Sequence, residues 1–173
     1  FSIFPNSLVD FSDNLFVNFV VSLLSLFGAI GFIVISDVWL TLRHQRSRVT
    51  LTTKIILTAT LGFILAGWLF LFFCDQAIAT LPLGERFLVS GFQSMTAMTT
   101  VGFNTYPIED LFPAPVLVMV ILMVIGASPS GTGGGLKTTS ISAGFGAVWA
   151  TLRGVRDVSF WGRRIPLNRL LGA

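Results

Sequence analysis

Long runs without charge constrain this chain more than any other feature of its sequence. Four runs of 20 to 26 residues contain no Asp, Glu, Lys or Arg, at 14–36, 55–74, 87–108 and 111–136. A helix that crosses the hydrocarbon of a bilayer needs roughly 20 apolar residues. Only 11% of all residues are charged, whereas a soluble domain carries about 25%. We therefore expect an all-α membrane protein with the lipid bilayer as its solvent and partner.

The third run differs from the first two, which we expect to be simple spanning helices. Its first half, Leu88 to Met98, suits a short helix. Its second half, 99–107, is rich in β-branched residues, contains Gly102 and ends at Pro107, which makes it a poor helix. A helix of about 14 residues is ~21 Å long and does not cross the bilayer. We expect a re-entrant hairpin, in which a short helix enters the membrane and an extended strand returns.

The fourth run continues, with Lys137 as its one charge, as far as Leu152. A single helix from Leu111 to Leu152 would measure ~63 Å, about twice the ~30 Å thickness of the hydrocarbon. Residues 126–135 contain five glycines and one proline, so we expect the helix to break there. Irregular backbone at membrane depth persists only where it is buried in protein or lines water. The break therefore predicts a pore or a binding site.

Lysine and arginine lie mainly in two clusters, at 43–54 and 153–169. Short loops rich in these residues stay in the cytoplasm, so we expect residues 37–54 and 153–173 to be cytoplasmic. Both ends of the run 87–108 then face outside, which is consistent with a re-entrant hairpin. The clusters do not form the continuous basic face that binds nucleic acid, so we expect no nucleic-acid partner.

Residues 99–104 resemble the filter strand T-V-G-Y-G of potassium channels, with Phe103 in place of Tyr and Asn104 in place of the last Gly. A dehydrated K⁺ requires oxygen ligands, which successive backbone carbonyls supply when all of them face one axis. Glycine relieves this strained backbone, and a threonine hydroxyl can add a ligand at the inner end. The short helix before the strand directs the negative end of its dipole toward the ion. The candidate ion-binding residues are Thr99, Thr100, Val101, Gly102, Phe103 and Asn104, with K⁺ held at Thr100, Val101 and Gly102.

The glycine-rich segment before Lys137 also suggests a phosphate-binding loop, but its spacing is wrong. Such a loop needs glycine directly before Lys and Ser or Thr, and Leu136 occupies that position. A flexible kink and a helix-packing site of small residues remain alternatives to a pore. Because a charge inside a membrane is a candidate for function, we expect Lys137 to lie near the pore axis and to hold or modulate the loop. The apolar runs contain neither paired carboxylates nor a His/Cys cluster, so we expect no enzyme activity and no cofactor.

Together the two motifs resemble the TrkH/KtrB family of potassium transport subunits, which is related to fungal Trk and plant HKT proteins. Residues 92–104 resemble the third filter segment of that family, and residues 126–139 resemble its intramembrane gate loop. The resemblance implies potassium uptake through four helix–pore–helix repeats in one chain, with K⁺ as the substrate. It also implies a gate loop that includes Gly126, Ser128, Ser130, Gly131, Thr132, Gly133, Gly134, Gly135 and Lys137.

The same resemblance implies how the chain is divided and what it works with. Residues 1–50 would end the second repeat, 51–152 would form the third, and 153–173 would form a basic cytoplasmic linker. The chain would then be an internal piece of a longer protein, whose remaining repeats complete the filter. The family implies the bacterial inner membrane, a homodimer, and a cytoplasmic nucleotide-binding regulatory subunit. The alternative is a homotetrameric two-helix potassium channel built on residues 51–152, which four-fold symmetry of identical chains would reveal.

Overall fold

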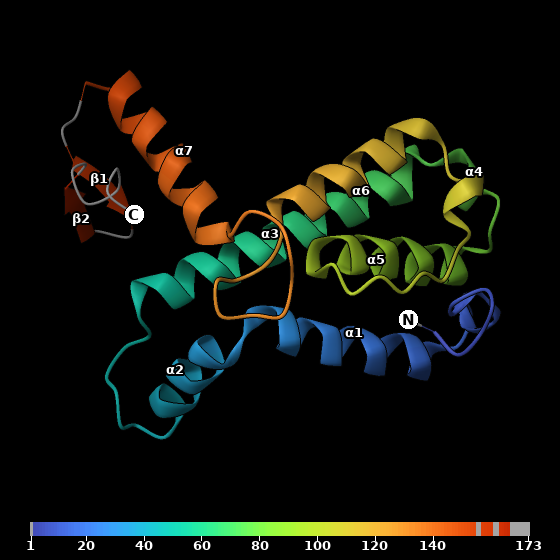
Figure 1. Cartoon of the computed structure of the whole chain (residues 1–173), viewed down its shortest axis with the longest axis horizontal. Coiled ribbons are helices and arrows are strands. Elements are labelled where there is room, and N and C mark those ends of the chain that lie inside the picture. Colours follow the sequence, from blue (N-terminus) through green and yellow to red (C-terminus); the bar gives the residue numbers. More distant parts are fainter. Residues whose placement is uncertain (1, 155–156, 161–162, 167–173) are drawn as a thin grey trace.

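The computed structural model describes residues 2–154, 157–160 and 163–166, and in this part of the chain nearly all regular structure is helical (Figure 1). The α-helices are α1 (Leu15–Ile30), α2 (Phe32–Leu42), α3 (Leu51–Cys74), α4 (Gln76–Ala79), α5 (Leu83–Thr99), α6 (Pro113–Ile125) and α7 (Thr138–Leu152). Two short 3-10 helices, η1 (Val9–Phe11) and η2 (Ile108–Asp110), precede α1 and α6, and strands β1 (Asp157–Phe160) and β2 (Arg163–Pro166) pair antiparallel. The all-α membrane class is confirmed, with this hairpin as a short addition. The remaining residues of the predicted linker, 155–156, 161–162 and 167–173, lie outside the described residues.

Helix α3 is the long helix on which the others pack. The Thr50 hydroxyl accepts a hydrogen bond from the Thr53 amide (3.3 Å) and caps its first turn. Its 24 residues extend ~36 Å, enough to cross a bilayer, and an 18-residue stretch within it has a mean hydropathy of 2.3. Within the described residues it is the one helix that is long and apolar enough to span by itself. Its buried side chains recur every three or four positions, at Thr53, Ile56, Thr60, Ile64, Gly67 and Leu71.

Helix α5 packs along this face of α3 through small residues and one aromatic pair. The buried Ser94 hydroxyl donates a hydrogen bond to the Ile64 carbonyl (2.7 Å). Gly67 lies so near that a Cβ on it would be 2.5 Å from the Ser94 Oγ. Trp68 meets Phe87 edge-on, with ring centroids 4.4 Å apart. These contacts fix the position of α5 relative to α3.

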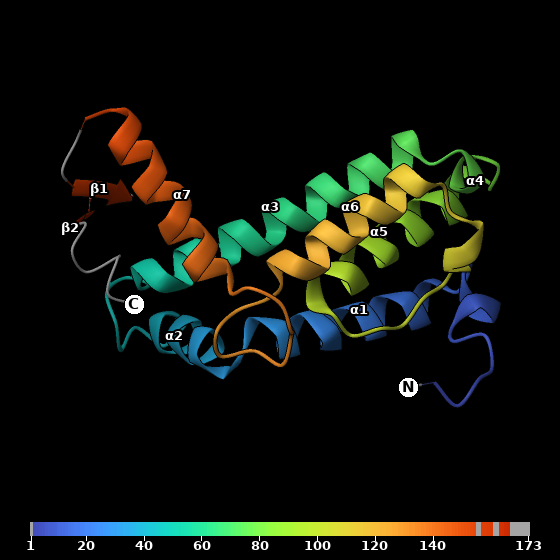
Figure 2. The ribbon, with the colours of Figure 1, turned by 45° about the horizontal axis from the view of Figure 1, so that its top comes forward.

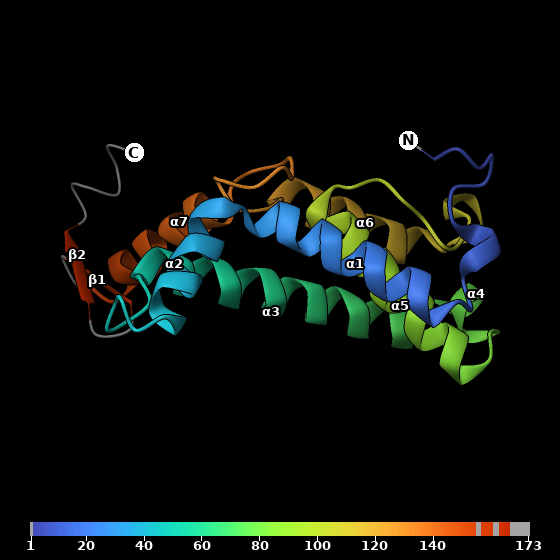
Figure 3. The ribbon, with the colours of Figure 1, turned by 90° about the horizontal axis from the view of Figure 1, so that it is seen from below.

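Helix α5 enters the molecule only part of the way, as expected for a re-entrant hairpin. It ends about midway along α3, and residues 100–107 return beside it to the end where it began (Figures 1 and 2). The helix is longer than predicted, because it begins at Leu83 and includes Thr99. Helices α1, α3 and α6 all contact it (Figure 3). The strand that leaves α5 is therefore held inside the bundle.

The prediction of a simple spanning helix over 14–36 is wrong. The run is divided into α1 and α2 at Gly31, where φ is +80° and the helix axis bends by 95°. Glycine adopts a positive φ at no steric cost, so the bend falls where the chain lacks a Cβ. Taken together, the two helices still have the length and composition of one bent span. The physical reason for the bend lies in a contact with a distant segment, described below.

The fourth run breaks as predicted. Helix α6 ends at Ile125, α7 begins at Thr138, and the intervening residues form an irregular segment that we call the glycine loop (126–137). This loop reaches the junction of α1 and α2 (Figure 2). The basic segment 43–50 and the end of α7 lie at one end of the molecule, opposite α4 and η2 (Figure 1). The first basic segment and the helix end that precedes the second one thus lie at the same end of the molecule; that this end faces the cytoplasm stays a prediction.

Candidate functional site

The strand after α5 has an unusual backbone. The dihedral φ is positive at Thr100 (+55°) and at Gly102 (+85°), and it is not positive at Val101 or Phe103. An ordinary β-strand points successive carbonyls to opposite sides, whereas alternation in the sign of φ turns them toward one side. A β-branched residue such as Thr100 rarely adopts this conformation, so its neighbours must hold it there. This backbone suits a row of ion-binding carbonyls.

Thr99 belongs to the helix and not to the strand. It is the last residue of α5, and its hydroxyl donates a hydrogen bond to the Met95 carbonyl one turn earlier (2.8 Å). Thr100 ends the helix in a left-handed conformation, with ψ of 29°. The end of α5 thus lies directly at the inner end of the strand, where the predicted dipole acts. Thr100, Val101 and Gly102 follow the helix directly, and their binding of K⁺ stays a prediction.

The outer end of the strand is fixed by residues from the beginning of the chain. The Asn104 amide donates to the Ser7 hydroxyl (3.0 Å), and the Leu8 amide donates to the Asn104 carbonyl (3.0 Å). The buried Gln93 side chain donates to the Tyr106 carbonyl (2.9 Å). Because the Asn104 carbonyl is already engaged by Leu8, it is less available to an ion than the carbonyls before it.

The glycine loop closes on itself, so that its two ends lie side by side. The Leu136 amide donates to the Val124 carbonyl (2.7 Å), and the Thr138 amide donates to the Ala127 carbonyl (3.2 Å). Gly126 at one end and Gly135 at the other both have positive φ, +64° and +78°. A closed loop of this kind is held by its own backbone bonds and presents its middle to the neighbours.

One side of the glycine loop meets the inner end of the strand. The Gly134 amide donates a hydrogen bond to the Thr100 Oγ1 (2.6 Å). A Cβ on Gly133 would lie 2.9 Å from the Thr99 carbonyl oxygen, so the loop backbone lies directly against the end of α5. The Lys137 ammonium donates to the Gly133 carbonyl (2.9 Å) across the loop. The strand and the loop, predicted separately from the sequence, are therefore brought into direct contact.

The other side of the glycine loop meets α1. The Thr132 amide donates to the Gly28 carbonyl (3.0 Å), and the Ser128 amide donates to the Ala29 carbonyl (3.3 Å). Ser128 is fully buried, and its hydroxyl lies 3.3 Å from that of Ser130. Sequence reasoning missed this part of the site. The signal that pointed to it was a pair of glycines inside the first uncharged run.

A hollow of about 480 Å³ lies between α1, the strand and the glycine loop. Its walls include Thr100 and Val101 from the strand, Ser25 and Gly28 from α1, and Thr132 from the loop. Apolar side chains, among them Val21, Leu24 and Phe103, make up most of the rest of the lining. The described residues contain no group of three His, Cys, Asp or Glu side chains that could hold a metal ion.

Comparison with known proteins gives one family and several relatives. The family model TrkH, described as a cation transport protein, matches residues 1–165. The chain is 34% identical over 172 residues to Ktr system potassium uptake protein B of Vibrio alginolyticus, and the matched region covers 95% of this chain and 37% of the relative. It is 36% identical over 170 residues to Ktr system potassium uptake protein D of Bacillus subtilis, with the same two coverages. It is 29% identical over 176 residues to the potassium/sodium uptake protein NtpJ of Enterococcus hirae, covering all of this chain and 38% of that protein.

The coverage of these relatives limits what the match says. The chain spans a little over a third of the length of the curated relatives, so it corresponds to one part of each. The family model describes transport proteins and not enzymes, and it implies no cofactor.

Proposed function

Because the chain belongs to the TrkH family of cation transport proteins, we propose that it supplies one filter strand of a potassium-uptake pore and the loop that closes this pore from inside. Two of the relatives are named potassium uptake proteins and a third is named a potassium/sodium uptake protein. K⁺ is the substrate, and no cofactor takes part. Residues 99–104 form the filter segment, and the glycine loop forms the gate.

The observation that carries this proposal is the hydrogen bond from the Gly134 amide to the Thr100 hydroxyl oxygen (2.6 Å). A threonine at this position offers its hydroxyl to a cation that leaves the filter. Here the loop occupies that oxygen and lies against the Thr99 carbonyl. An ion can pass only after the loop leaves, so the docked loop corresponds to the closed state.

Within the filter, the ion is coordinated by carbonyls and not by side chains. The carbonyls of Thr100, Val101 and Gly102 replace its water shell, supported by the alternating signs of φ along the strand. The Asn104 carbonyl contributes less than these three, because the Leu8 amide already donates to it. One strand surrounds only part of an ion, so three further strands complete the ring.

The remaining repeats, the partners and the location follow from the same proposal. Residues 1–50 end the second repeat, 51–152 form the third, and 153–173 form the cytoplasmic linker. The other repeats of the parent chain supply the missing strands, and the complete protein works as a homodimer in the bacterial inner membrane. Its basic cytoplasmic segments are where a nucleotide-binding regulatory subunit would bind. We do not propose the homotetrameric two-helix channel, because the family match extends over residues 1–165 and includes α1.

The test is uptake of Rb⁺, a K⁺ substitute, and of Na⁺ by the full-length protein in vesicles, with and without Gly102→Ser. A side chain at φ of +85° costs about 1–2 kcal/mol in that backbone. This cost corresponds to a roughly 5–30-fold change in the ratio of the filter backbone in this conformation to the filter backbone in other conformations. We expect the preference for Rb⁺ over Na⁺ to weaken by a factor of that order. The matched control is Gly62→Ser, since nothing lies within 4 Å of a Cβ on Gly62. Unchanged selectivity in a folded Gly102→Ser protein would contradict the filter assignment.

A further inference from the structure

At the break between α1 and α2, two carbonyls at the end of α1 accept hydrogen bonds from the glycine loop and not from α2. In an uninterrupted helix, each carbonyl accepts from the amide four residues later, so Gly28 would accept from Phe32 and Ala29 from Ile33. At the break these carbonyls accept instead from Thr132 and from Ser128 of the loop. The first amides of α2 correspondingly lack an acceptor within their own helix.

The two backbones approach each other so closely that only glycine fits. A Cβ on Gly31 would overlap the Ser130 carbonyl and would lie 2.6 Å from the Gly131 amide nitrogen. A Cβ on Gly131 would in turn overlap the Ala29 carbonyl. The bend at Gly31 and the position of the loop therefore depend on each other.

We propose that a straight α1–α2 helix and a docked glycine loop are alternative states of this protein. Straightening at Gly31 brings the Phe32 and Ile33 amides to the Gly28 and Ala29 carbonyls, which displaces the loop amides. Displacement of the loop from α1 also removes it from Thr100, because both contacts belong to one closed loop. Three hydrogen bonds are lost, two to α1 and one to Thr100, and two are formed. The two states thus differ by a net of one hydrogen bond, so a modest bias can decide between them. The inference rests on the proposed role of the loop as the gate.

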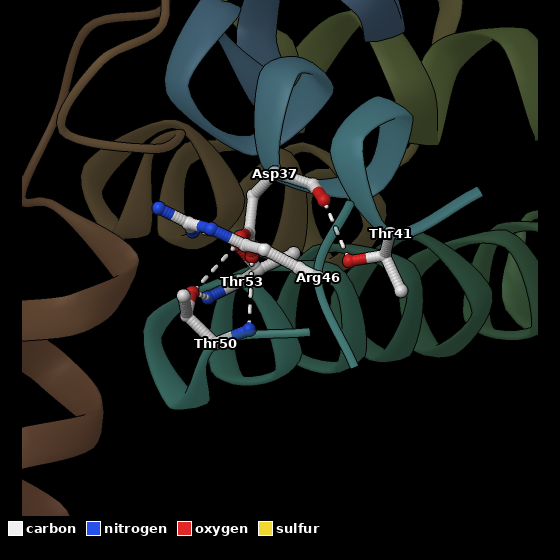
Figure 4. Close-up of polar contacts among 5 residues, drawn as sticks. All are labelled: Asp37, Thr41, Arg46, Thr50 and Thr53. Carbon is white, nitrogen blue, oxygen red and sulfur yellow. Dashed lines mark hydrogen bonds and ion pairs between the residues drawn. The ribbon is translucent and has the colours of Figure 1, made fainter. Parts of the chain in front are cut away.

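Contacts at the cytoplasmic end of α2 can shift the equilibrium between the straight and the bent helix. The buried Asp37 carboxylate accepts from Arg46 (2.6 Å) and from the Thr50 amide (2.9 Å), and its backbone carbonyl accepts from Thr41 (Figure 4). Arg46 and Thr50 lie in the basic segment that leads to α3. A partner that binds this basic segment therefore moves α2 through Asp37, and α2 in turn determines whether the loop keeps its acceptors.

The test is Gly31→Ala in the full-length transporter. Alanine disfavours the positive φ of the bent state and favours a continuous helix, so the ratio of straight to bent should rise about 5–30-fold. We expect resting Rb⁺ uptake to increase by a similar factor, with its preference over Na⁺ unchanged. Gly62→Ala in α3 is the matched control, because it adds the same methyl group in open space.

Spin labels on α1 and α2 report the bend directly. Cysteines replace Phe16 and Leu42, both exposed in this chain, after the exposed native Cys74 is changed to serine. With 1.5 Å per residue, the two positions are about 39 Å apart on a straight axis and about 27 Å apart when two arms meet at a 95° bend. We expect the Gly31→Ala protein to gain population at the longer distance. If that protein does not fold, Gly28→Ala repeats the test more mildly, because its Cβ lies 3.0 Å from the Thr132 Oγ1.

The outcomes separate this inference from the proposed function. Gly133→Ala, whose Cβ would lie 2.9 Å from the Thr99 carbonyl oxygen, disturbs the docked loop without changing Gly31 and is measured in the same transporter. If this variant increases uptake, then an unchanged label distance in Gly31→Ala, or a longer distance with unchanged uptake, overturns the coupling. If neither Gly31→Ala nor Gly133→Ala increases uptake while the labels do move apart, the glycine loop is not the gate and the proposed function fails with it. A longer distance together with higher uptake supports both.

Discussion

Replacing Gly133 by alanine should open the pore without changing which ion passes. The added methyl group would lie 2.5 Å from the Ala127 Cβ and 2.9 Å from the Thr99 carbonyl oxygen, whereas carbon atoms in good contact lie about 3.5–4.0 Å apart. Neither neighbour can rotate away, since Ala127 is buried with a single methyl group and the Thr99 oxygen is backbone. Overpacking of this kind costs about 1–3 kcal/mol. Ala127 belongs to the loop itself, so only the collision with Thr99 of α5 is relieved when the loop undocks. The ratio of undocked to docked protein should therefore rise toward the lower end of roughly 5–150-fold.

The assay is resting Rb⁺ uptake by the full-length transporter in vesicles, with Na⁺ uptake measured beside it. Gly134→Ala is the matched control from the same loop, because its Cβ would meet the Thr100 Oγ1 at an ordinary 3.5 Å. The Gly134 amide that donates to this oxygen is kept in the alanine variant. We expect higher uptake from Gly133→Ala, no change from Gly134→Ala, and the same ion preference in both.

Two results would refute this reasoning. Uptake that is unchanged or lower in a folded Gly133→Ala protein would mean that the contact with Thr99 does not close the pore. An equal rise in both variants would mean that the loop responds to any added methyl group and not to the close approach at Gly133.

Two further substitutions test the loop and the bundle separately. Lys137→Met removes the ammonium that donates to the Gly133 carbonyl. A hydrogen bond to a charged group contributes about 1.5–3 kcal/mol, and because Lys137 is half-buried we expect the lower end of this range, measured as a several-fold rise in resting Rb⁺ uptake. Unchanged uptake and gating would show that Lys137 does not hold the loop. Gly67→Ala places a Cβ 2.5 Å from the Ser94 Oγ and should destabilise the bundle by about 1–3 kcal/mol. The Tm in detergent should therefore fall for Gly67→Ala and stay unchanged for Gly62→Ala. Equal Tm values for the two variants would show that α3 and α5 can move apart at no cost.

The sequence predicted those features that depend on composition within one segment. The short helix before the strand and the break in the fourth run were both predicted by comparing the length of an uncharged run, taken as a helix, with the thickness of the bilayer. The strand could be located because Gly102 and its flanking β-branched residues form a poor helix, and the structure places the strand where this pattern predicted it. Local composition was sufficient for each of these.

The bend at Gly31 could not be predicted in the same way. Two glycines, Gly28 and Gly31, inside 23 uncharged residues are compatible with a spanning helix, because glycine is frequent in membrane helices. The bend depends on Ser130 and Gly131, about 100 residues later in the chain, which fill the space beside Gly31. The positive φ of Thr100 is a similar case, since a threonine adopts it only where its surroundings impose it.

The glycines of the loop serve different purposes, and this difference weighs against a merely flexible kink. Gly126 and Gly135 have positive φ, so they allow the chain to turn at the two ends of the loop. Gly131 and Gly133 lie so close to α1 and α5 that a side chain would collide with backbone. Gly134 has neither constraint. A flexible hinge would tolerate alanine about equally at all these positions, whereas a docked gate tolerates it only at Gly134, so a scan of alanine through the loop distinguishes the two.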